Sequence, residues 1–578
     1  MNQIPNHKRI IYQIFTRLFG NTRQANLPNG TIDQNGAGKF NDITQEALQS
    51  IADLGVTDVW YTGIIHHAQL TSYKAYGITE DHPSIVKGIA GSPYAIKDYY
   101  DVDPDLASHV PDRMAEFEAL VQRTHEHDLR VIIDFVPNHV ARQYKSSCLP
   151  SGVRDLGQDD NTDQPFHPQN NFYYLSEPFT PPLEEQNMGL VPYNETPAKA
   201  TGNDVFSPRP HQNDWYETVK LNYGVDYQNG YHTHFDPIPS TWIKMKDILL
   251  YWAGKNVDGF RCDMAEMVPV EFWGWAITEV KKQYPHVIFI AEIYNATLYQ
   301  SFINNGKFDY LYDKVGLYNR VRSLVEGHGS AEDLTWLWQN ESGSFSHRML
   351  RFLENHDEQR IASQYFAGDP FKALPAVTLC ASMHTGPFMI YFGQELGVNP
   401  TESEGFQGND GRTTIFDYWS IPEIQAWNNQ GKFDETALSD AQIQLRHYYA
   451  TLCNFVLNSP AISTGAFFDL QYVNNNGQSS NYNANRIYSY LRYNEDEQLL
   501  CVYNFDHDNT YNTFIRIPEQ LLEEILLLKS NDSFSLSGII SNTKNEEIKS
   551  INISDASING IPITLTPNSV KIFRFTRD

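Results

Sequence analysis

An arginine and an aspartate stand two residues apart in the short apolar stretch 257–263, and together they could supply a carboxylate nucleophile. The stretch has the length and composition of a buried strand, on which Arg261 and Asp263 would point to the same side. A neighbouring positive charge favours the ionised form of a carboxyl, and an ionised, oriented carboxylate at a strand end suits nucleophilic catalysis. A structural salt bridge would have the same spacing, so this pair alone does not distinguish a catalytic nucleophile from a structural ion pair.

Three more apolar stretches end in acidic or histidine residues. They are 130–139 with Asp134 and His139, 287–292 with Glu292, and 349–357 with His356 and Asp357. In a parallel barrel the catalytic side chains gather at the C-terminal ends of the strands. We therefore expect one opening of the barrel, its mouth at the C-terminal ends of the strands, to hold Asp263, Glu292, Asp357, His139 and His356.

The segments between these stretches alternate between helix and strand patterns. Residues 44–54, 114–127 and 242–255 have helical spacing, and each precedes a strand-like run. The first strand is expected at 10–15 and the last within 386–395. This alternation predicts an α/β fold, a TIM (β/α)8 barrel in which short loops carry the site.

Taken in order and by spacing, the four stretches resemble the four short signature regions of glycoside hydrolase family 13, the α-amylase family. The resemblance implies a retaining glycosidase that acts on α-1,4-glucans or maltooligosaccharides through a covalent glycosyl-enzyme. Asp263 would be the nucleophile and Glu292 the acid and then the base. Asp357 would bind two sugar hydroxyls and strain the ring towards its transition state.

The resemblance also implies a set of substrate-binding residues. Tyr94 would form a platform under the sugar that is cleaved, His139 and His356 would donate hydrogen bonds to it, and Arg261 would support the nucleophile. Asn138 matches a residue that often binds structural calcium, so a structural Ca²⁺ is expected there. The chemistry itself needs no cofactor.

Three positions depart from the family pattern. Ala95 stands where many members have an aspartate, and Glu266 and Met267 stand where endo-acting amylases often have lysine and histidine. These departures leave room for an α-glucosidase and for a glucosyltransferase or isomerase of the same family. A non-catalytic sugar-binding member is a further alternative, against which the presence of Asp263, Glu292 and Asp357 argues.

Composition limits the partners. The formal net charge is −27, which argues against nucleic acid and anionic membranes and is compatible with a neutral glucan or oligosaccharide. No apolar run is long enough for a membrane helix, and the start of the chain has no signal-like apolar segment, so a cytoplasmic location is expected unless a signal was removed. The five cysteines are widely spaced and form no CxxC pair, and Cys262 is expected to face away from the mouth as a packing residue. The oligomeric state stays open.

Changes of pattern along the chain suggest three domains. Residues 1–140 and 222–460 are expected to form the catalytic barrel. Residues 141–221, rich in proline, asparagine and glycine, lack the alternation and predict an irregular insertion after the third strand. Residues 461–578 alternate with a period of two, which predicts a C-terminal antiparallel β-sandwich.

Overall fold

The computed structural model describes residues 8–182, 191–475 and 481–577. Its centre is one sheet of eight parallel strands in the order β13-β12-β11-β10-β5-β2-β1-β14. The strands are β1 Ile10–Phe15, β2 Asp58–Thr62, β5 Arg130–Phe135, β10 Gly259–Cys262, β11 Ile288–Ala291, β12 Tyr310–Tyr312, β13 Met349–Leu350 and β14 Phe388–Tyr391. A parallel bridge between Arg351 and Phe388 joins the two edge strands, so the sheet closes into the expected (β/α)8 barrel.

The strand residues are buried on both faces, because helices cover the outside of the barrel and side chains fill its inside. The covering helices include α3 Gln45–Asp53, α4 Arg113–His125, α5 Ser240–Ala253, α6 Val270–Gln283, α8 Asn319–Val325, α10 Leu374–Ser382 and α12 Asp440–Asn458. Sequence-local caps fix some of their ends. Thr44 accepts the Ala47 N–H at the start of α3, and Ser439 and Gln442 form a capping box on α12.

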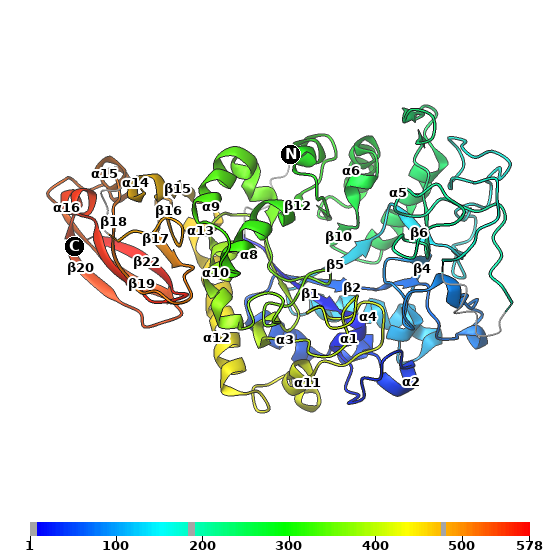
Figure 1. The fold of residues 1–578 in the computed structure, drawn as a ribbon, viewed down its shortest axis with the longest axis horizontal. Coiled ribbons are helices and arrows are strands. Elements are labelled where there is room, and N and C mark those ends of the chain that lie inside the picture. Colours follow the sequence, from blue (N-terminus) through cyan, green and yellow to red (C-terminus); the bar gives the residue numbers. More distant parts are fainter. Residues whose placement is uncertain (1–7, 183–190, 476–480, 578) are drawn as a thin grey trace.

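The insertion leaves the barrel after β5. Its first and last strands, β6 His139–Ala141 and β7 Thr218–Lys220, pair antiparallel and bring its two ends together. Between them, the described residues 142–182 and 191–217 contain no α-helix and only isolated bridges. In Figure 1 these loops, coloured cyan to green, lie at the right end of the molecule beside the barrel.

The C-terminal part lies at the other end of the molecule, in orange and red (Figure 1). It contains an antiparallel sheet in the order β15-β16-β17-β22-β19-β20 and a pair of strands, β18 Tyr511–Ile515 and β21 Ile561–Leu565. The longer sheet consists of β15 Ala466–Asp469, β16 Ile487–Tyr493, β17 Gln498–Asn504, β19 Ser533–Ser541, β20 Glu547–Asn552 and β22 Val570–Arg577. Beside the pair of strands, two short helices, α15 Glu519–Leu526 and α16 Ile553–Ile558, belong to the same apolar core. These helices fall in the segment that we expected only to continue the sandwich; apolar residues at helical spacing account for α15.

One face of the six-stranded sheet packs on the barrel. Tyr490 and Tyr503 belong to the same buried cluster as the barrel strands. Their hydroxyls lie 2.7 Å apart, and each lies within 2.9 Å of the Ser382 hydroxyl at the end of α10. This face of the sheet therefore belongs to the apolar core of the barrel, while its other face lines the separate core that includes α15 and α16.

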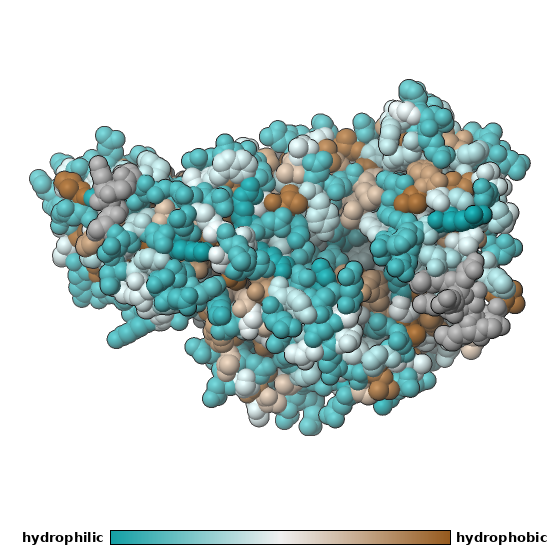
Figure 2. Space-filling view, viewed as in Figure 1, coloured by the Kyte–Doolittle hydropathy of each residue, from teal (hydrophilic) through white to brown (hydrophobic). Residues whose placement is uncertain are grey.

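The face of the molecule in Figure 2 is mostly hydrophilic, with apolar residues scattered over it. Among the described residues, no helix combines the length and the apolar character needed to cross a bilayer.

Candidate active site

Two carboxylates follow neighbouring strands at the C-terminal end of the barrel. Asp263 comes directly after β10 and Glu292 directly after β11, and the last residues of these strands, Cys262 and Ala291, pair in register. Parallel neighbours lie about 4.8 Å apart, so the two acidic side chains start close together. Both are buried, with 6% and 2% of their surface exposed. The expectation that they share one mouth agrees with this geometry, and Cys262 is buried in the core as expected.

One guanidinium connects the two carboxylates. Arg261 Nη1 lies 2.8 Å from Asp263 Oδ1, Nη2 lies 2.8 Å from Glu292 Oε1, and Nη1 also lies 3.4 Å from Asp134 Oδ1. We expected Arg261 to keep Asp263 ionised, and the structure corrects this. Burial and the neighbouring Glu292 raise the pKa of Asp263 well above its usual range, because one arginine shared among three carboxylates offsets only part of their repulsion.

Glu292 is held from three sides. Its Oε1 accepts a hydrogen bond of 2.8 Å from the Tyr294 hydroxyl, in addition to the Arg261 contact, and its Oε2 accepts one of 2.8 Å from the Met264 N–H. Met264 has φ 42°, in the left-handed region that non-glycine residues rarely adopt, and this turn aims its N–H at Glu292. Such outliers concentrate at functional sites.

Glu266 fastens the loop that follows Glu292. Its Oε2 accepts the N–H groups of Tyr294 and Asn295 at 3.2 and 2.9 Å. Glu266 is one of the positions that depart from the family pattern. In the structure its contacts are to the backbone, so it positions the loop that carries Tyr294.

The third carboxylate, Asp357, lies beyond the short strand β13 with His356 beside it. His356 Nε2 lies 3.1 Å from Asp357 Oδ2 and 2.6 Å from the Tyr94 hydroxyl, while the Gln13 amide N–H faces Nδ1 at 2.9 Å. Burial favours neutral Asp357, but His356, Arg261 and Arg412 outweigh it and hold the pKa of Asp357 below its usual range.

Tyr94 reaches the same place from the loop before β4 (Ile96–Val102). Its ring stacks on His356 with centroids 5.2 Å apart and planes at 28°, and the Arg261 guanidinium lies 5.3 Å from its centroid. Trp60 Nε1 donates to Asp134 Oδ2 at 3.0 Å beneath this group. Tyr94 is thus held in place by His356 and Arg261, two other residues that were expected to bind the substrate.

His139 opens the insertion at the start of β6. Its ring lies 5.3 Å from that of Trp215, and its exposed fraction is 3%. Burial and the nearby Lys220 charge lower the pKa of His139 to about 3, so it is neutral near pH 7. A neutral imidazole can donate a hydrogen bond to a sugar hydroxyl without adding charge.

Asn138 does not have the surroundings that a calcium ion needs. Its Oδ1 accepts a hydrogen bond of 2.6 Å from Lys220 Nζ, and the nearby Met267 carbonyl oxygen lies 3.3 Å from the same nitrogen. An ammonium group therefore already faces the oxygens that the ion would use. The residues present do not fit calcium at this position.

A second group of possible metal ligands lies on the paired strands β3 (Ile65–His67) and β4. It consists of the buried residues His66, Asp98 and Asp101. Arg113 pairs with both oxygens of Asp101 at 2.9 Å, and Asp98 Oδ2 accepts the N–H groups of Ser147 and Cys148. These partners already satisfy both carboxylates, so the group is a structural network.

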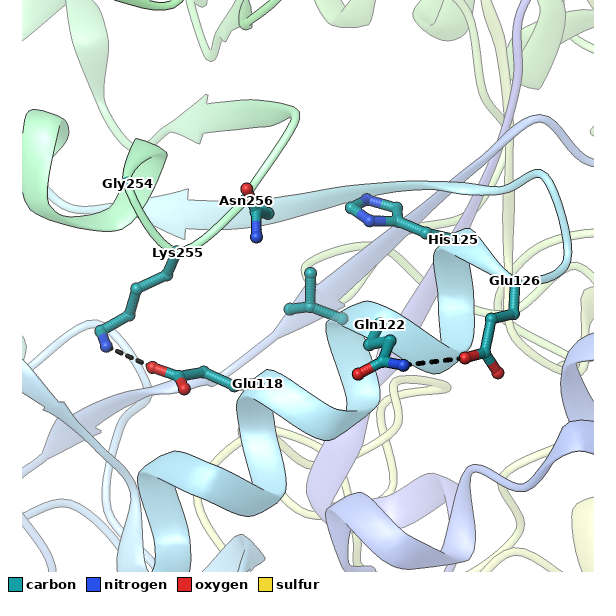
Figure 3. Close-up of a pocket in the computed structure, with 8 residues that line it drawn as sticks. Glu118, Gln122, His125, Glu126, Gly254, Lys255 and Asn256 are labelled. Atoms are coloured by element: carbon teal, nitrogen blue, oxygen red, sulfur yellow. Dashed lines mark hydrogen bonds and ion pairs between the residues drawn. The ribbon is translucent and has the colours of Figure 1, made fainter.

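A surface hollow lies at the opposite end of the strands (Figure 3). Glu118, Gln122, His125, Lys255 and Asn256 line it, from the end of α4 and the turn before β10. None of the candidate catalytic residues reaches it, and conserved chemistry in these barrels sits at the other face. Its Lys255–Glu118 and Gln122–Glu126 contacts are surface pairs that contribute little.

Several residues of the site escaped the sequence analysis. They are polar or aromatic side chains that hold the candidate residues in place: Gln13, Trp60, Tyr294, Tyr312 and Lys220. Gln13 gave a signal, because a single amide inside an apolar strand needs a partner. The others look like ordinary core or loop residues.

A closed parallel barrel with paired carboxylates and two histidines beyond its strand ends has the layout of a glycoside-processing enzyme. The family model for the α-amylase catalytic domain matches residues 13–428. The chain is 23% identical to "Alpha-amylase 3" of Dictyoglomus thermophilum over 533 residues, which cover 88% of this chain and 87% of that protein. It is 27% identical to an "Alpha-1,4-glucan:maltose-1-phosphate maltosyltransferase" of Cereibacter sphaeroides over 245 residues, 39% of each chain.

Solved structures share the fold over nearly the whole length. A noncanonic maltogenic α-amylase, AmyB, from Thermotoga neapolitana has a TM-score of 0.60 at 20% identity, with 99% of both chains covered. An α-amylase from Geobacillus thermoleovorans, solved with acarbose, has a TM-score of 0.61 at 18% identity, again with 99% of both covered. This chain belongs to the α-amylase family, glycoside hydrolase family 13, and its relatives include both α-amylases and maltosyltransferases.

Proposed function

We propose that this enzyme is a retaining α-glycoside hydrolase that acts on α-1,4-glucans or maltooligosaccharides. The observation that supports it best is the placement of Asp263 and Glu292 on adjacent strand ends around one arginine. Retaining enzymes hold their two carboxyls about 5–5.5 Å apart, closer than inverting enzymes do. Neighbouring parallel strands bring two side chains to that range.

In this mechanism Asp263 attacks the anomeric carbon while Glu292 protonates the departing oxygen. The glycosyl–Asp263 ester then reacts with a water from which Glu292 takes a proton. The first step begins with one proton on the carboxyl pair, carried by Glu292, and the second begins with Glu292 deprotonated and regains that proton from the water. The raised pKa of Asp263, caused by burial and by Glu292, supports a free enzyme whose pair retains a proton that it shares.

Asp357 and the histidines would bind the sugar at the same centre. Asp357, with 31% of its side chain exposed, is the most accessible of the three carboxylates and can accept two ring hydroxyls. His356 and neutral His139 would donate hydrogen bonds, and Tyr94 would lie under the ring. Such contacts stabilise the transition state when they strengthen as positive charge develops on the sugar.

The substrate class rests on the relatives. They include α-amylases, and one solved relative, AmyP, was crystallised with maltose. The second candidate is glucosyl transfer by the same covalent intermediate. It is favoured by the maltosyltransferases among the relatives and by Glu266, which stands where endo-acting amylases often have lysine or histidine and here holds the backbone of the loop with Tyr294.

The nucleophile can be tested by trapping. Incubation with an activated fluorosugar, proteolysis and mass spectrometry should find the label on the peptide with Asp263, and Asp263→Asn should bind maltotriose without turnover. Glu354→Gln, which changes another buried carboxylate paired with Arg360, is a stability control. Label on Glu292 or Asp357, or an inverted product anomer, would refute the assignment. Products from starch and maltotriose then separate free reducing sugars from rearranged ones.

A further inference from the structure

Lys220 is a buried lysine whose ammonium group lies where three separate segments meet. It is the last residue of β7, and its side chain is 2% exposed. Nζ lies 2.6 Å from Asn138 Oδ1, 2.6 Å from Asp204 Oδ1 and 3.3 Å from the Met267 carbonyl oxygen. An ammonium has three N–H donors, and these acceptors use all of them.

The acceptors come from both sides of the junction between barrel and insertion. Asn138 follows β5, Met267 follows β10, and Asp204 belongs to the insertion. Asn138 is itself fully buried and donates to the Gly202 carbonyl at 2.8 Å. The ring of Tyr227 lies 5.1 Å from Nζ and closes the remaining side. One positive charge thus meets one carboxylate and two neutral oxygens.

We propose that the Lys220 ammonium is the cation of this junction and that the folded enzyme takes no calcium there. Calcium binds six to eight oxygens at about 2.3–2.6 Å and favours several carboxylates. Here one carboxylate and two neutral oxygens are oriented towards a nitrogen. A divalent ion among them would lie within contact distance of a positive charge, and burial makes that repulsion strong.

The junction also bears on the candidate active site. His139 pairs with Lys220 in the β6–β7 ladder, and its Nδ1 lies 3.2 Å from Asn138 Nδ2. The same lysine therefore fixes the residue before His139 and the strand opposite it. Lys220 is a positioning residue that holds the insertion and His139 against the barrel.

The first measurement uses the unaltered protein. Thermal unfolding after exhaustive dialysis should give the same Tm in EDTA and in millimolar CaCl₂, and metal analysis should find no calcium retained. A lower Tm in EDTA that calcium restores, together with one calcium per chain, would overturn the proposal. This comparison needs no variant and is independent of the reaction.

The second measurement exchanges the cation. Lys220→Met should lower the Tm by several degrees and raise KM for maltotriose more than it lowers kcat, because Asp204 and Asn138 lose their partner next to His139. Lys220→Ala removes more of the side chain, and a calcium or methylammonium titration should recover part of its Tm loss. Lys199→Met, a lysine of the insertion whose nearest carboxylate oxygen is 3.9 Å away, is the matched control. A Lys220→Met protein with unchanged Tm and KM would contradict the positioning role.

Discussion

The Tyr294 hydroxyl offers a direct test of the carboxyl pair. It is 2.8 Å from Glu292 Oε1; Tyr294 is half-buried, and its partner Glu292 is buried. Tyr294→Phe removes one O–H donor and little volume. The donor stabilises the deprotonated form of the Asp263–Glu292 pair, so its loss should make the pair hold its proton more tightly.

The size of the effect follows from the type of bond. A hydrogen bond to a charged group contributes about 1.5–3 kcal/mol, and about 1.4 kcal/mol corresponds to one pH unit. The alkaline limb of kcat/KM, which reports loss of the proton from the free pair, should therefore move up by about 1–2 pH units. The assay is the pH profile of hydrolysis of an aryl α-maltoside, with Tm measured in parallel.

Tyr511→Phe is the matched control, because the Tyr511 hydroxyl donates to Asp506 at 2.7 Å in the C-terminal part of the chain. It should leave the profile in place. A Tyr294→Phe enzyme with reduced rate or stability but an unmoved alkaline limb would refute the reasoning. Tyr294 would then serve only to pack the loop.

Two further outcomes are expected. Glu292→Gln should lose nearly all hydrolysis of starch while keeping part of its glycosylation rate on a glycosyl fluoride, whose leaving group needs little acid help; equal losses on both substrates would argue against Glu292 as the acid. Burial lowers the pKa of His66 from 6.5 to about 4, so the unfolded chain binds more protons between these values and stability should fall by up to about 3 kcal/mol as the pH drops from 6.5 to 4. His66→Gln should flatten this part of a Tm–pH curve, whereas His447→Gln, at an exposed position, should not.

The sequence predicted the fold and the site best where the signal lay within one strand or directly after its end. Buried parallel strands are continuous apolar runs, and their ends place Asp263, Glu292 and Asp357 without reference to distant residues. The barrel, the insertion and the C-terminal antiparallel sheet followed from such local patterns. Helix α15 was missed although Leu521, Leu522, Ile525 and Leu526 have helical spacing, because the segment is only eight residues long and lies among strands.

The charge state of the site was harder to foresee. Sequence spacing put Arg261 beside Asp263, but Glu292 and Asp134 reach the same guanidinium from other strands. The oxygens that Lys220 contacts could not be predicted either, because they belong to Asn138, Asp204 and Met267, which are distant in the chain. Contacts that depend on three or more elements cannot be read from the spacing within one.

The hydroxyl cluster of Ser382, Tyr490 and Tyr503 bears on whether the C-terminal sheet is a detachable module. Domains that meet over small polar surfaces can separate and melt alone, but a large apolar contact couples them. Here a truncated barrel would expose the apolar face beneath the sheet and leave the Ser382 hydroxyl without its two tyrosine partners. We therefore expect the barrel and the C-terminal sheet to unfold as one cooperative unit, although the sheet comes from only the last part of the chain.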